Sequence, residues 1–286
     1  LRTMPHMRLR EFEKRTATAK TLEKEYPDNH LIHNLKGGIY LNKKDTANSR
    51  ASFEKALSLD PTYFPAVANL AQLDLQNKKP DAAKKRFEDI LAKDKKNIQA
   101  MTALSGLALN QGQNNEATVW LERSHKENPD ALQPAMLLAA HYLGSGEKQK
   151  SLALAKKLQG TNPGNPDVLE LLSQAQFVNN DTAGALESTS KLAFMQPESP
   201  VAQFRLASSH MALQNWSAAS DALKKALALK PDYLDAQLMQ VMLEARKENY
   251  LGALSISRQI QKQHPKSSLG YIAEGDLIMK KKNPVL

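Results

Sequence analysis

The sequence predicts an all-α fold of about sixteen helices, arranged as a series of 34-residue helical hairpins. Three observations predict it, and the first is a proline register. Proline lacks a backbone N–H and clashes with the preceding turn, so a regular series of prolines marks a regular series of helix ends. Eight positions from 27 to 265 follow one another at intervals of 34 residues. One of them holds Lys95, and the others hold Pro27, Pro61, Pro129, Pro163, Pro197, Pro231 and Pro265.

The second observation is a pair of small-residue registers that keep step with the prolines. Small residues on two successive helices let antiparallel helices approach to about 8–10 Å between axes, which predicts a helical hairpin in each unit. Twelve residues before the proline slot stand Ser49, Ala83, Ala117, Ser151, Ala185, Ala219 and Ala253. Twenty-four residues before it stand Gly37, Ala71, Ser105, Ala139, Ser173, Ala207, the larger Val241 and, in the last unit, Gly275.

Composition is the third observation. The chain of 286 residues is 41% hydrophobic and 24% charged, enough apolar material for a folded core. Only 6% of residues are aromatic, and Ala, Leu, Lys and Gln recur, which favours helices over sheets. No apolar run approaches the roughly 20 residues that a transmembrane helix needs. The chain has no cysteine, which excludes disulfides, zinc–thiolate sites and thiol nucleophiles.

The predicted elements follow the register from one end to the other. A single array spans 1–286, with a partial repeat at 1–29 that holds a helix near 12–25, and residues 1–11 are not assigned. Complete repeats are predicted at 30–63, 64–97, 98–131, 132–165, 166–199, 200–233 and 234–267. A partial repeat follows at 268–286, with a helix near 268–281. Short turns separate the two helices of a repeat at 43–45, 77–80, 112–114, 144–146, 179–181 and 247–249.

These residues resemble the tetratricopeptide repeat (TPR), whose signature combines Leu-Gly-x2-Tyr, Ala-x3-Phe and Pro within a single repeat. Gly37 with Tyr40 and Ala83 with Phe87 fill the signature slots. The resemblance implies a right-handed α-solenoid, or superhelix, whose first helices line an inner groove that binds a partner. The usual tryptophan slot departs from the signature, and holds His33, Val67, Met101, Ala135, Leu169, Gln203, Gln237 and Tyr271.

A narrower resemblance rests on the segments 64–94, 206–238 and 258–284. These segments look like the TPR-repeat lipoproteins of the PEP-CTERM/exosortase system of Gram-negative bacteria. That resemblance implies a periplasmic or outer-membrane-anchored protein linked to exopolysaccharide production, with a lipid anchor upstream of Leu1. A cytoplasmic location stays open. The chain begins without Met, and we expect it to be a fragment of a longer protein.

If the TPR arrangement holds, one set of side chains on the first helices faces the partner groove. Amides dominate early and methionines late, which suits a peptide or protein segment because methionine adapts to irregular partners. We expect Met239 and Met242 to be at least half exposed, although apolar side chains at helical spacing also suit a core and amides suit a solvated face. The set comprises Asn34, Asn69, Gln72, Gln76, Gln99, Asn110, Gln133, Met136, Gln174, Phe204, Met211, Leu238, Met239 and Met242, with Met279 in the last unit.

The residues offer no catalytic, cofactor or metal site, and we expect a scaffold rather than an enzyme. His30 and His33 share a helix face, but no carboxylate completes a metal-binding set. The net charge of +9 leaves an alternative, a cytoplasmic basic α-solenoid that binds nucleic acid, and a further one, binding of an anionic polysaccharide. The lysine runs at 84–85, 156–157 and 224–225 fall on second helices, where a solvated convex face is the expected arrangement.

Overall fold

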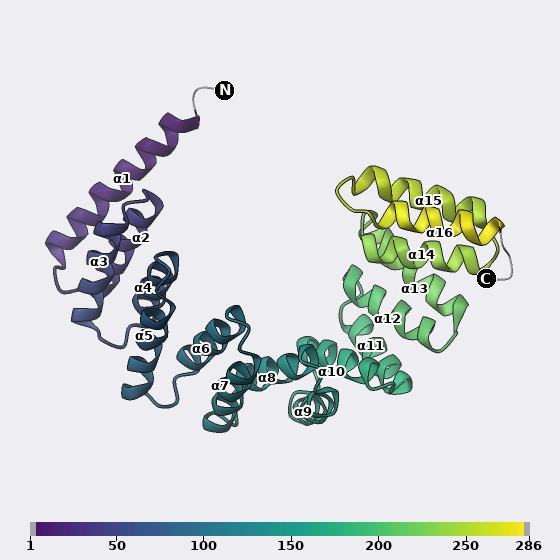
Figure 1. The fold of residues 1–286 in the computed structure, drawn as a ribbon, viewed down its shortest axis with the longest axis horizontal. Helices are drawn as coiled ribbons and strands as arrows, with labels where there is room; N and C mark the ends of the chain where they lie inside the picture. The colour runs from purple at the N-terminus through teal and green to yellow at the C-terminus, as the bar shows by residue number, and fades with distance from the viewer. Residues whose placement is uncertain (1–3, 283–286) are drawn as a thin grey trace. The chain divides into compact units, whose positions relative to one another are not determined.

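The computed structural model describes residues 4–282, and the side chains of residue 14 and residues 16–280. Every regular element in residues 4–282 is an α-helix, and there are sixteen of them (Figure 1). The predicted all-α class and the predicted helix number are therefore confirmed. The helices alternate between a first type of mostly 13 residues and a second type of mostly 14, which is the expected hairpin rhythm.

The helix bounds repeat with the proline register. The first-type helices are α2 (His30–Asn42), α4 (Phe64–Gln76), α6 (Ile98–Asn110), α8 (Leu132–Gly144), α10 (Pro166–Val178), α12 (Pro200–Ala212), α14 (Leu234–Arg246) and α16 (Leu269–Lys282). The second-type helices are α1 (Met4–Glu25), α3 (Thr46–Leu59), α5 (Pro80–Lys93), α7 (Asn114–Glu127), α9 (Lys148–Thr161), α11 (Thr182–Met195), α13 (Trp216–Leu229) and α15 (Tyr250–Gln263).

The chain forms two compact units, Leu1–Leu138 and Ala139–Leu286, which we call unit 1 and unit 2. In unit 1, each helix from α1 to α6 packs against the helix that follows it. In unit 2, each helix from α9 to α16 packs against the next, and α14 also contacts α16. The prediction that all repeats form one continuous array across the boundary between the two units, at residue 138, stays a prediction.

Helix α1 is longer than the sequence indicated. It begins at Met4 rather than near residue 12, so the unassigned residues 4–11 are helical, and residues 1–3 lie outside the described residues. Pro5 stands in the first turn of this helix, where the missing N–H removes no intrahelical hydrogen bond. At the other end, α16 agrees with the predicted helix near 268–281 within one residue.

The hairpin turns have one backbone conformation, which recurs from repeat to repeat. In seven turns the second residue after the first helix has a positive φ, a conformation that costs non-glycine residues about 1–2 kcal/mol. The turn predicted at 112–114 begins one residue earlier, and the turn around Gln214 was not predicted. The seven residues are Lys44, Lys78, Gly112, Gly146, Asn180, Gln214 and Glu248.

The small-residue slots lie where the two helices of a hairpin touch. All seven second-helix slots are buried, and so are the first-helix slots from Gly37 to Val241. Two hairpins join the slots by a hydrogen bond: Ser49 Oγ donates to the Gly37 carbonyl at 2.9 Å, and Ser151 Oγ donates to the Ala139 carbonyl at 2.8 Å. Gly275 is exposed, contrary to the others, because no described helix follows α16.

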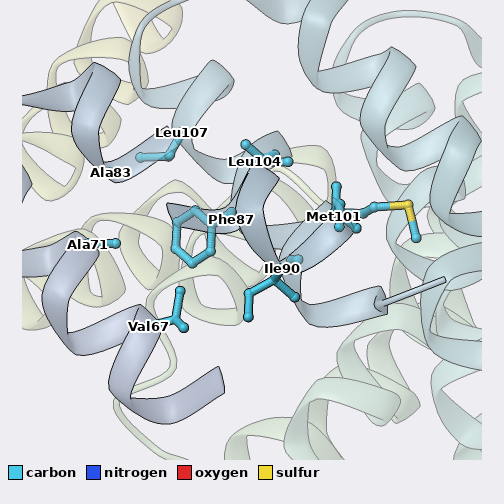
Figure 2. Packing of buried hydrophobic residues seen from close by; sticks show 10 residues of the cluster. Val67, Ala71, Ala83, Phe87, Ile90, Met101, Leu104 and Leu107 are labelled. Atoms are coloured by element: carbon cyan, nitrogen blue, oxygen red, sulfur yellow. The ribbon is translucent and has the colours of Figure 1, made fainter. Parts of the chain in front are cut away.

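The core runs between successive hairpins. Figure 2 shows one part of it in unit 1, where Val67 of α4, Phe87 and Ile90 of α5, and Met101 and Leu104 of α6 meet. Each is at least 95% buried. Burying a side chain of this size stabilises a fold by about 1.5–3 kcal/mol, so such clusters hold neighbouring hairpins together.

Before α16, where Tyr271 is exposed, the tryptophan slot of the TPR signature is used in two ways. Val67, Met101 and Leu169 fill it with apolar side chains that are nearly fully buried. In three other hairpins the slot holds a polar donor, which reaches back to the carbonyl of the proline six residues earlier. These contacts join His33 Nε2 to Pro27 at 2.7 Å, Gln203 Nε2 to Pro197 at 3.3 Å and Gln237 Nε2 to Pro231 at 2.7 Å.

Candidate functional site

The predicted partner-facing amides of unit 1 lie on its first-type helices, and most of them are exposed. Asn34 of α2 and Asn69 of α4 are half-buried, and Asn69 Nδ2 donates to Asn34 Oδ1 at 3.3 Å. Met136 of α8 is also half-buried. The exposed members of the set are Gln72, Gln76, Gln99, Asn110 and Gln133. This part of the predicted set therefore forms a hydrated polar surface rather than an apolar groove.

In the middle of unit 2, the predicted residues are engaged within the chain. Gln174 Nε2 donates to Glu170 Oε1 at 2.7 Å, and Arg205 Nε donates to the same oxygen at 3.0 Å. Phe204 packs against Tyr233, with ring centroids 5.1 Å apart. Phe204 therefore serves packing between neighbouring helices.

A groove of about 880 Å³ lies at the C-terminal end of unit 2, between α12, α14 and α16. We call it the C-terminal groove. Three members of the predicted set, Met211, Leu238 and Met242, line it. Its other lining residues are Trp216, Val241, Ala245, Arg246, Glu248, Tyr250, Leu269, Ile272, Ala273, Asp276, Leu277 and Lys280. The lining is mainly apolar, and its four charged side chains are two acids and two bases.

The two methionines of α14 differ in exposure. Met242 is 62% exposed, as expected, but the expectation that Met239 is at least half exposed is wrong. Met239 packs against the cluster of Ala207, Leu223 and Leu243, to which Phe204 also packs. Side chains three positions apart lie on the same face of a helix, about 60° from each other, so Met239 turns toward the neighbouring cluster while Met242 stays at the open surface. Met279 of α16 is 65% exposed.

From α16, sequence reasoning placed only Met279 in the partner-facing set and missed the residues of that helix that line the groove. A usable signal was present, because Ile272 stands one repeat length after Leu238, and both line the groove. Ile272 is 53% exposed, although it is a large apolar side chain. Trp216 and Arg246 also meet at the groove, where the guanidinium carbon lies 3.8 Å from the ring centroid. No repeat register links these two residues.

The lysine runs lie on second-type helices, as predicted, and several are paired with acids. Lys84 Nζ donates to Glu116 Oε1 at 2.6 Å, a hydrogen bond that raises the pKa of Lys84 and lowers that of Glu116. Lys85 pairs with Asp89 at 3.0 Å, on the same helix. Such pairs are typical of a solvated helix face.

The two histidines of α2 are held by neighbouring groups. His33 Nε2 hydrogen-bonds the Pro27 carbonyl, and the His30 ring meets Tyr63 edge-on at 4.6 Å. Within the described residues, no group of three or more His, Cys, Asp or Glu side chains is arranged to hold a metal ion. None of the described helices combines the length and apolar character of a membrane span.

Comparison with known families fits this geometry. Tetratricopeptide repeat family models match residues 40–107, 75–141 and 204–268, which together make up more than half of the chain. The chain therefore belongs to the tetratricopeptide repeat family, whose members are generally non-enzymatic scaffolds for protein–protein interaction. No curated protein matches it in sequence.

Solved structures share the fold at low sequence identity. A tetratricopeptide repeat protein from Parabacteroides merdae is 12% identical, with a TM-score of 0.61 over 87% of this chain and 98% of that one. Yeast Tom70 is 15% identical, with a TM-score of 0.58 over 96% of this chain and 61% of that one. YrrB, described as a TPR protein with an unusual peptide-binding site, is 16% identical, with a TM-score of 0.51 over 68% of this chain and 97% of that one.

Proposed function

We propose that this protein is an interaction scaffold whose C-terminal groove binds an apolar segment of a partner protein. The observation that carries the proposal is the combination of a groove of about 880 Å³ with exposed apolar side chains in its lining, chiefly Met242 and Ile272. Large apolar side chains that share one concave surface are typical of protein-binding sites.

The polar first-helix surface of unit 1 is a weaker candidate for this role. Its exposed amides are solvated donors and acceptors, and replacing water by a partner gains little net free energy per hydrogen bond. In the C-terminal groove, a partner removes apolar surface from water, which contributes about 25 cal/mol for each Å² buried. Methionine in the lining also lets the groove adapt to an irregular ligand.

The test uses peptides selected from a phage-displayed random library against the full chain. We expect selected peptides to bind at least about tenfold more weakly to the variant Met242→Gln, which keeps side-chain length and charge but makes the site polar. The matched control is Leu109→Gln, because Leu109 is 43% exposed on α6 of unit 1. Peptides that bind both variants as tightly as the unchanged protein contradict the proposed site.

We further propose a bacterial envelope setting, linked to exopolysaccharide production or to export of PEP-CTERM proteins. What supports it is the resemblance of segments 64–94, 206–238 and 258–284 to TPR lipoproteins of that system. Osmotic-shock and membrane fractionation of cells that carry the tagged full-length gene tests this setting. Recovery with the periplasm or outer membrane is expected, and recovery in the cytoplasm contradicts it.

A further inference from the structure

One cation of the C-terminal groove lies against an aromatic ring. Arg246 stands in the last turn of α14, and its guanidinium carbon lies 3.8 Å from the centroid of the Trp216 ring, at the start of α13. Stacking on an aromatic face fixes the plane of a guanidinium and leaves its N–H groups free at the edge. Trp216 is half-buried, Arg246 is exposed, and both line the groove.

The donors of Arg246 have no acceptor within the described part of the chain. Among the described residues, Arg246 contacts the Trp216 ring, and no Asp or Glu carboxylate forms an ion pair with it. Arg205, the other arginine on a first-type helix of unit 2 close to the predicted set, differs because Glu170 accepts its Nε–H at 3.0 Å. The N–H groups of a guanidinium bind most strongly to a carboxylate that accepts two parallel N–H bonds.

The charges around Arg246 leave this position open to an acidic group. The lining carries two bases and two acids, so its net charge does not select a ligand. Asp276 and Lys280 stand four residues apart on α16, at a spacing where opposite charges on a helix attract each other. Glu248 belongs to the turn after α14 and is exposed to solvent. Selection therefore depends on the local geometry of Arg246.

We infer that the partner segment carries an internal Asp or Glu side chain, which pairs with Arg246 while neighbouring apolar side chains lie against Leu238, Met242 and Ile272. This inference rests on the proposed protein-binding function and names the chemistry of the partner. The apolar floor supplies most of the affinity, and the paired carboxylate fixes the register of the segment in the groove.

The experiment extends the peptide selection with a double-mutant cycle. Peptides that lose affinity for Met242→Gln are sequenced, and each shared acidic residue is replaced by its amide. Affinities of the parent and amide peptides are then measured for the unchanged protein, for Arg246→Gln and for Arg246→Lys. Lys230→Gln is the matched control, because Lys230 lies over the Tyr233 ring at 5.3 Å, outside the groove, and carries the same charge.

We expect the groove-binding peptides to share an acidic residue. The parent peptide should bind Arg246→Gln at least about tenfold more weakly, and the amide peptide should show no further loss on that variant. Arg246→Lys should recover part of the affinity, since it keeps the charge without the planar donors. Lys230→Gln should leave affinity unchanged.

Two results overturn the inference while leaving the proposed function intact. One is a set of peptides sensitive to Met242→Gln that share no acidic residue. The other is an equal loss of the parent and amide peptides on Arg246→Gln and Arg246→Lys, which gives Arg246 a structural role. If no selected peptide is sensitive to Met242→Gln, the proposed function itself fails.

Discussion

In unit 1, the second-helix slot four residues after the small residue holds Phe53, Phe87 and Leu121, whereas in unit 2 the same slot holds Ala155, Thr189, Leu223 and Ser257. All seven side chains are buried. Phe53 takes the space that a Cβ at Gly37 would occupy, since its ring lies 2.5 Å from that position. The two units therefore share one hairpin geometry but fill it with side chains of different volume.

The first-helix surfaces differ more than the cores. The predicted partner-facing side chains of unit 1 are mostly exposed amides, whereas unit 2 ends in an apolar groove lined by Leu238, Met242 and Ile272. A residue between the two helices of a hairpin is constrained by the facing helix. A residue on the partner-facing surface of the first helix has no such neighbour. Under the proposed function, differences on that face select the partner, and we expect the core differences to change stability.

The two tryptophans separate the units in a stability measurement. Trp120 lies in unit 1 and Trp216 in unit 2, and the chain has no other tryptophan. In the background Trp216→Phe, fluorescence in urea follows unit 1, and in the background Trp120→Phe it follows unit 2. Each stability prediction below is measured in this way.

The largest expected effect is the loss of an aromatic core residue in unit 1. Phe53→Ala should lower the free energy of unfolding of unit 1 by about 3–5 kcal/mol, because it leaves a cavity against Gly37. In unit 2, Ser257→Ala at the same slot should have a far smaller effect, since it removes one hydroxyl. If Phe53→Ala and Ser257→Ala lowered the free energy of unfolding equally, the size of the side chain at this slot would not distinguish the two cores.

A buried acid should make unit 1 sensitive to low pH. Asp74 of α4 accepts a hydrogen bond from Arg50 at 2.7 Å and another from Arg86. Burial raises the pKa of Asp74, but the hydrogen bonds and charges of Arg86 and Arg50 outweigh it and hold that pKa below its ordinary value. The unfolded chain then binds the proton more tightly, so this stabilisation is present above pH about 4 and is lost as pH falls through the folded-state pKa.

Asp74→Asn removes that dependence. We expect unit 1 of the variant to be about 1–3 kcal/mol less stable at neutral pH, because two partly exposed arginines lose their carboxylate. The difference from the unchanged protein should shrink in acid. A constant difference from pH 7 down to pH 3 would contradict the role given to the charge of Asp74.

Overpacking the small slot should affect both units alike. Ala83→Leu in unit 1 and Ala219→Leu in unit 2 each place a large side chain at a fully buried helix contact. We expect each to lower the free energy of unfolding of its own unit by about 1–3 kcal/mol. An unchanged urea midpoint for either variant would disprove the hairpin contact in that unit.

The smallest effect is expected in the hairpin turns. Gly112 and Gly146 have φ of 73° and 83°, which glycine adopts without steric cost. Alanine at either position should destabilise its unit by about 0.5–1 kcal/mol, because the left-handed cost exceeds the entropy gained in the unfolded chain. Lys44→Gly at the same turn position should not destabilise unit 1, and a clear loss of stability there would contradict the turn geometry.

The repeat register explains how much of the fold could be predicted. Nearly all helix ends could be predicted from the prolines between 27 and 265 and from the small-residue slots. The prolines mark the ends of helices, and the small residues mark the contact between the two helices of a hairpin. The start of α1 was missed because none of the register positions falls within residues 4–11. The turn at Gln214 was missed because the neighbouring helices, rather than the residue itself, impose the positive φ.

The candidate site was less predictable than the fold. Met211, Leu238 and Met242 could be placed on the groove from their positions in the first helices, and the repeat register could also have found Ile272. The burial of Met239 could not be predicted, because it depends on how α12 brings Phe204 close to α14. The stack of Arg246 on Trp216 likewise depends on tertiary packing between residues that no local pattern joins.

Hydrogen–deuterium exchange of the full chain, with and without a selected peptide, tests the central claim most directly. Binding in the C-terminal groove should slow amide exchange in α12, α14 and α16, and leave exchange in α2, α4 and α6 unchanged. Slower exchange confined to α2, α4 and α6 would place the partner on the polar surface of unit 1 and contradict the account.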